Sequence, residues 1–78
     1  MNFLVRHGTP LYQAQLQARA LSAWRDAELV VRTRWDVFLV ADDPSRRDAF
    51  AAYVAALDAE AAAAGALADA SSDLAEAA

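Results

Sequence analysis

The stretch from Pro10 to Ala41 constrains the fold of this chain more than any other segment. It contains both tryptophans, no glycine, and no proline after its first residue. Its apolar side chains recur every three or four residues, which predicts a single helix over residues 10–41. At about 1.5 Å per residue, this helix would be roughly 50 Å long.

The apolar face of this predicted helix is wide. Two neighbouring rows of apolar residues cover an arc of roughly 200°, whereas a helix packed against one core needs only about 100°. The surplus predicts contacts on more than one side of the helix. The residues that we expect at an interface are Leu11, Tyr12, Leu16, Trp24, Val30, Val31, Trp35, Val37 and Phe38.

A turn is predicted directly after this helix. Pro44 restricts Asp43 to extended backbone and itself suits the first turn of a helix. A second helix is therefore predicted over residues 44–64, and Gly65 is predicted to end it. Because the link is only about three residues long, the two helices should run antiparallel. The expected packing stripe of the second helix is Phe50, Tyr53, Val54, Leu57, Ala61 and Ala64.

The two ends of the chain are expected to add little to this hairpin. Residues 1–9 are predicted to be a flexible leader, and the acidic, alanine-rich residues 66–78 a frayed or disordered tail. The predicted fold class is therefore all-α, an antiparallel two-helix hairpin with unequal arms over residues 10–65. The longer first helix would project beyond the second, so we expect two copies to pair as a four-helix bundle.

The length of the chain limits the size of its core. Seventy-eight residues form at most one domain, and a chain this short buries only about 60% of its unfolded surface. It has no cysteine and one histidine, so we expect no disulfide, no metal site and no cofactor. Self-association, or docking on another protein, is the remaining route to a larger core.

Charge and composition indicate the expected environment. The net charge is −4, and residues 48–78 carry six acids and no base. This balance argues against general affinity for nucleic acid or for anionic membranes. Without a long apolar run or a signal peptide, the protein is expected in the cytoplasm or in an assembly built there. Twenty-two alanines, and seven arginines without any lysine, suggest a GC-rich bacterial or phage genome.

One short motif resembles a known enzyme family. The segment Phe-Leu-Val-Arg-His-Gly-Thr at residues 3–9 resembles the Arg-His-Gly signature of the histidine phosphatase and phosphoglycerate mutase family. The resemblance implies that His7 would be phosphorylated and that Arg6 would bind the phosphate, within a three-layer α/β fold. That family needs a second histidine and further strands. His7 is the only histidine, and no second strand is readable after Thr9.

The remaining polar residues form no recognisable catalytic set. The arginines are spread around the first helix and interrupted by acids, and Asp58 and Glu60 do not converge on one substrate. The aromatic residues at helical spacing favour a packed core. We therefore expect a non-enzymatic protein–protein interaction or oligomerisation module, a structural or assembly component of a larger complex. The alternatives are a small acidic accessory or inhibitor protein that docks on a partner, or a small DNA-binding regulator.

Overall fold

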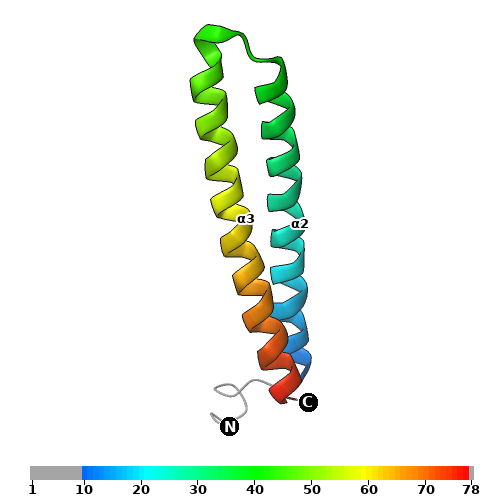
Figure 1. Ribbon diagram of the computed structural model, residues 1–78. Helices are drawn as coiled ribbons and strands as arrows, with labels where there is room; N and C mark the ends of the chain where they lie inside the picture. Colours follow the sequence, from blue (N-terminus) through cyan, green and yellow to red (C-terminus); the bar gives the residue numbers. More distant parts are fainter. Residues whose placement is uncertain (1–9, 78) are drawn as a thin grey trace.

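The computed structural model describes residues 10–77, which form two long helices (Figure 1). Helix α2 spans Pro10–Val40 and helix α3 spans Asp43–Ala77. The helices run antiparallel, side by side, and are joined by residues 41–42. No strand occurs within residues 10–77. The predicted all-α helical hairpin is confirmed, whereas the predicted leader, residues 1–9, lies outside the described residues.

The turn is closed by backbone and side-chain hydrogen bonds. The amide of Ala41 donates to the carbonyl of Phe38 at 3.2 Å, and the amide of Ser45 donates to the carbonyl of Asp42 at 3.0 Å. The guanidinium of Arg46 donates to the carbonyl of Ala41 at 3.2 Å and lies 5.8 Å from the centre of the Phe38 ring. These contacts satisfy polar groups that the two helix ends leave without intrahelical partners.

The second helix does not end at Gly65, which corrects the sequence-based boundary. Helix α3 continues to Ala77, so the arms contain 31 and 35 residues and the predicted longer first arm is wrong. A glycine inside a helix costs only about 1 kcal/mol relative to alanine. Contacts beyond it offset that cost, because Leu67 and Leu74 are half-buried and Gln17 Nε2 donates to Ser71 Oγ at 3.3 Å. Residues 66–77, which we expected to be frayed or disordered, are helical.

The two helices meet along a seam with a seven-residue repeat. On each helix a series of covered residues recurs in steps of four and three, with one step of seven from Val31 to Phe38 on α2. This is the spacing of a left-handed coiled coil. On α3 the seam residues are Ala49, Tyr53, Ala56, Glu60, Ala63, Leu67, Ala70 and Leu74. On α2 they are Gln13, Gln17, Ala20, Trp24, Ala27, Val31 and Phe38.

The seam of α3 differs from the apolar stripe expected for that helix. Alanine fills every seventh position from Ala49 to Ala70, which lets the two backbones approach closely. Phe50, Val54 and Leu57 lie outside the seam and are 49%, 38% and 38% exposed. The Phe50 ring still contacts Phe38 of α2 at the edge of the seam. The expected packing stripe is therefore displaced from the observed seam, and Tyr53 is the one residue that the two share.

This hairpin encloses very little core. Among the described residues only Ala56 is buried, with 6% of its surface exposed. The chain exposes 5757 Å², about a quarter more than the roughly 4,600 Å² typical of a compact monomer of this mass. Its radius of gyration is 17.5 Å, against about 11.5 Å for a compact domain of this length. The molecule is a rod of 60 × 16 × 15 Å, a single layer of two helices.

Candidate protein interaction surface

Four aromatic rings form a closed cycle of contacts across the two helices near the turn. Trp35 and Phe38 of α2 have ring centres 5.4 Å apart, and Phe50 and Tyr53 of α3 have ring centres 6.3 Å apart. Across the helices, Trp35 lies 5.0 Å from Tyr53 and Phe38 lies 5.4 Å from Phe50. All four pairs are tilted and fall within the favoured separation of about 4.5–7 Å.

This ring cycle is open to solvent on one side. Trp35 is 40% exposed and Phe50 is 49% exposed. Large apolar neighbours extend the open side along both helices, because Leu39 lies one turn after Trp35, and Val54 and Leu57 lie one and two turns after Phe50. We call Trp35, Leu39, Phe50, Val54 and Leu57 the aromatic flank.

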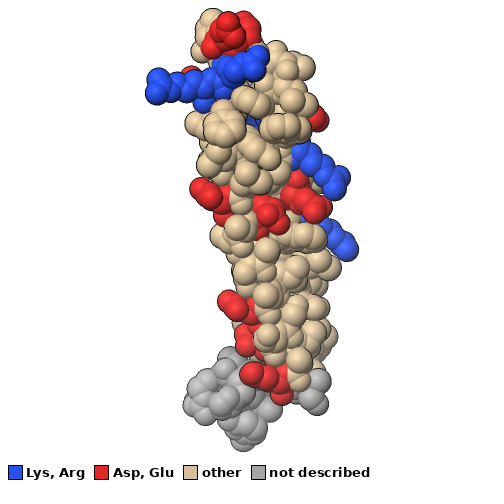
Figure 2. All heavy atoms as spheres, in the orientation of Figure 1, with Lys and Arg blue, Asp and Glu red and all other residues tan. Residues whose placement is uncertain are grey.

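Charged residues border the aromatic flank on α3. One side of α3 carries a row of residues in steps of four and three, which begins with Arg46 and ends with Glu60. Between these two charged residues the row contains Phe50, Tyr53 and Leu57. Figure 2 shows charged side chains of both signs at the turn and again midway along the rod, with uncharged surface between them. The aromatic flank is therefore a continuous apolar area bounded by charge.

A second apolar area lies on α2 alone. Tyr12, Val30 and Val37 are 49%, 45% and 45% exposed, and their spacings of eighteen and seven residues place them on one side of the helix. We call these three residues the α2 flank. Val37 is two residues from both Trp35 and Leu39, which places it about 200° around the helix from each. The two flanks are thus separate surfaces.

The nine residues predicted at an interface divide into two groups. Leu11, Tyr12, Val30, Trp35 and Val37 are exposed. The other four are partly covered: Leu16, Trp24, Val31 and Phe38. Of these, Trp24, Val31 and Phe38 belong to the seam between the helices. Four further large apolar residues are exposed that the predicted interface did not include: Leu39, Phe50, Val54 and Leu57. The sequence did contain a sign of the exposure of Phe50, Val54 and Leu57. A row of alanines that recurs every seven residues, from Ala49 to Ala70, lies beside these large residues and could form the helix contact instead.

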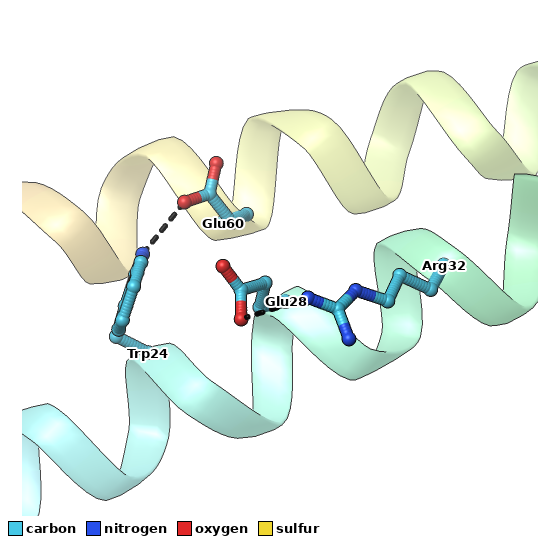
Figure 3. Close-up of polar contacts among 4 residues, drawn as sticks. All are labelled: Trp24, Glu28, Arg32 and Glu60. Carbon is cyan, nitrogen blue, oxygen red and sulfur yellow. Dashed lines mark hydrogen bonds and ion pairs between the residues drawn. The ribbon is translucent and has the colours of Figure 1, made fainter.

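A polar contact crosses the seam midway along the rod (Figure 3). The indole Nε1 of Trp24 donates to Oε2 of Glu60 at 2.6 Å, and a guanidinium nitrogen of Arg32 lies 3.7 Å from Oε1 of Glu28. Each carboxylate therefore has a structural partner of its own. Within residues 10–77 no group of three or more acids or histidines could hold a metal ion. Arg6 and His7, the residues of the phosphatase-like motif, lie outside the described residues.

Helix α3 is long and apolar enough over Asp43–Glu76 to cross a membrane by length and composition. Every stretch of eighteen residues in it with at most two charges contains both Asp58 and Glu60. A carboxylate at the centre of a bilayer costs about 2.5–3.5 kcal/mol on insertion scales. The apolar character of α3 comes mainly from alanine, which also suits close packing on another helix. This composition favours packing against protein over a membrane span.

Comparison with protein-family models, with curated proteins and with solved structures gives no match to this chain. The fold itself defines a class, the antiparallel helical hairpin with a coiled-coil-like seam. The surface of that hairpin is therefore the part of the molecule that indicates a function.

Proposed function

We propose that this protein is a non-enzymatic helical interaction module that oligomerises as a structural or assembly component of a larger complex. One observation carries the proposal. Eleven large apolar side chains remain at least 38% exposed, while only Ala56 is buried among the described residues. Monomeric soluble proteins rarely expose contiguous apolar areas larger than a few hundred Å², and larger areas mark interaction sites.

The small core gives a thermodynamic reason for association. A chain of 8.4 kDa with no disulfide has few means of stabilising a single layer of two helices. A partner that binds only the folded hairpin stabilises the fold by mass action. Association would also cover apolar surface that the seam leaves in contact with water.

A dimer that forms a four-helix bundle is the simplest way to supply this cover. Two hairpins can pack with their helices about 20° from parallel, and the seven-residue repeat of the seam suits that left-handed geometry. A two-fold arrangement uses the same surface on both copies and closes after two chains. The expected partner is therefore the protein itself.

The test is the molar mass in solution over a wide range of concentrations, measured by light scattering and by sedimentation. We expect at least twice the 8.4 kDa of one chain, and an unfolding temperature that rises with concentration. A chain that remains monomeric throughout, with unfolding independent of concentration, would contradict the proposal. Recovery of the protein with lipid vesicles in place of self-association would favour a membrane role.

The acidic half of the molecule favours a second candidate function. From Asp48 onward the chain carries six acids and no base, and Figure 2 shows acidic side chains midway along the rod and toward the end opposite the turn. A small acidic accessory or inhibitor protein would present this surface to a basic partner. Its complex would weaken steeply with added salt, unlike an association driven by apolar contact.

A further inference from the structure

We infer that the aromatic flank is the surface on which a second copy of this chain docks, with the two flanks packed together across a two-fold axis. The inference rests on the proposed oligomerisation and specifies the face and the partner. It departs from the sequence analysis, which placed the interface mainly on α2.

Helix α3 carries its small and its large apolar residues on different sides. Its seam toward α2 is built mainly from alanine, while Phe50, Val54 and Leu57 lie outside the seam. Full burial of a Val, Leu or Phe side chain is worth about 1.5–3 kcal/mol, far more than burial of alanine. A helix that packed only on α2 would gain most by placing these large residues in the seam. Their position indicates a second packing face.

The two aromatic residues of the flank are held in place by neighbouring rings. Trp35 rests against Phe38 and Tyr53, and Phe50 rests against the same two rings. Rings supported in this way lose little conformational freedom when a partner covers them. Supported aromatic side chains are also the residues that most often dominate the binding energy of protein interfaces.

The exposed surface area of the chain matches what a second copy could cover. The chain exposes about 1,100 Å² more surface than a compact monomer of its mass. A stable protein interface of standard size removes about 800 Å² from each partner. A second hairpin, with a long axis of 60 Å, is large enough to cover that excess. No larger partner is required.

Charged side chains of both signs lie around the aromatic flank. On α2, Arg32 and Asp36 lie three residues before Trp35 and Leu39. On α3, Arg46 and Arg47 precede Phe50 by four and three residues, Asp58 follows Val54 by four, and Glu60 follows Leu57 by three. This border carries three positive and three negative charges. A two-fold copy presents the same balanced border, whereas a strongly basic or acidic partner would meet repulsion at half of these positions.

The α2 flank fits a dimer contact less well. Its three side chains belong to one helix and are spread over more than twenty residues. The aromatic flank, in contrast, spans both helices within the half of the rod nearest the turn. It is the more compact apolar area and holds both exposed members of the ring cycle.

The first test compares two pairs of substitutions. Leu39→Glu with Val54→Glu places charge in the aromatic flank, and Val30→Glu with Val37→Glu places the same charge in the α2 flank. Sedimentation should show a dimer dissociation constant raised at least about tenfold by the first pair and less than about threefold by the second. Circular dichroism confirms that each variant remains helical. The reverse order would overturn the inference while leaving the proposed function intact.

The second test identifies the partner as the chain itself. Because the protein has no cysteine, Val54→Cys and Val37→Cys introduce single thiols at positions that are 38% and 45% exposed. Near a two-fold axis a residue meets its own copy, so mild oxidation should yield a covalent dimer from Val54→Cys and little from Val37→Cys. A dimer that cross-links through Val37→Cys, or not through Val54→Cys, overturns the two-fold packing. A monomeric unmodified chain overturns both this inference and the proposed function.

Discussion

The indole of Trp24 and the carboxylate of Glu60 join the two helices through a hydrogen bond of 2.6 Å between Nε1 and Oε2 (Figure 3). Glu60 occupies a seam position, where its neighbours one heptad away are Tyr53 and Leu67. If one helix slid along the other, the carboxylate of Glu60 would move away from the indole of Trp24. Both polar groups would then be part-buried without this hydrogen bond. The bond therefore favours one alignment of the hairpin.

A double-mutant cycle with Trp24→Phe and Glu60→Ala should detect this bond. We expect a coupling of about 1–2 kcal/mol in the free energy of unfolding, below the upper range for charged hydrogen bonds because the contact is only part-buried. Urea unfolding at one fixed protein concentration provides the measurement. Glu28→Ala is the control, since its exposed pair with Arg32 should contribute less than about 0.5 kcal/mol. Purely additive effects of the two substitutions would show that the bond sets no alignment.

Gly65→Ala should stabilise the protein. Gly65 lies within α3, and a Cβ built on it has no neighbour within 4 Å. Because alanine has the higher helix propensity, the substitution should raise the free energy of unfolding by about 1 kcal/mol. The unfolding temperature should rise by several degrees. The matched control is Ala66→Gly at the exposed neighbouring position, which should lower stability by a similar amount. A loss of stability in Gly65→Ala would indicate that the helix breaks at this residue.

Enlarging Ala56 should force the helices apart. Ala56 lies in the seam and is 6% exposed, so a leucine side chain there would be larger than the space between the helices. Ala56→Leu should therefore lower the free energy of unfolding by about 1–3 kcal/mol. Ala55 precedes it on the exposed side of α3, and Ala55→Leu should change stability by less than about 0.5 kcal/mol. Thermal unfolding of the two variants at equal concentration provides the comparison. Equal effects would place the seam on another row of α3.

The last turns of α3 should contribute measurably to stability. Leu67 and Leu74 are half-buried in the seam, so Leu67→Ala and Leu74→Ala should each cost about 1–2 kcal/mol, less than in a fully buried core. Leu29→Ala is the matched control, because Leu29 is 58% exposed and its truncation should cost less than about 0.5 kcal/mol. Slow hydrogen exchange of the amides over residues 67–75 should accompany this result. If Leu67→Ala and Leu74→Ala lower the free energy of unfolding no more than Leu29→Ala does, the end of α3 does not pack on α2.

Local signals in the sequence were sufficient to predict the two helices and the turn. Uninterrupted apolar periodicity from Pro10 and the break at Pro44 act within a few residues, so they do not depend on the rest of the fold. The prediction for Gly65 failed because the same local reasoning omitted contacts made far away in sequence, such as that between Gln17 and Ser71. A modest local penalty was outweighed by tertiary packing.

The interface prediction stays a prediction, but the structure distributes its residues over the surface in a way that periodicity did not resolve. Five of the nine predicted residues are exposed, but only Trp35 belongs to the aromatic flank. Two neighbouring rows on α3 satisfy the same helical period, one rich in alanine and one containing Phe50 and Leu57. Periodicity predicts that a helix has an apolar side but does not choose between adjacent rows.

The sequence by itself determined that this chain forms two long helices that fold back on each other, because propensity, periodicity and proline geometry are local properties. Only the tertiary structure decided how far each helix is rotated about its own axis. The packing of the two helices placed the alanine row and Glu60 between them. That rotation left Phe50 and Leu57 at the surface beside Trp35, where they form the aromatic flank.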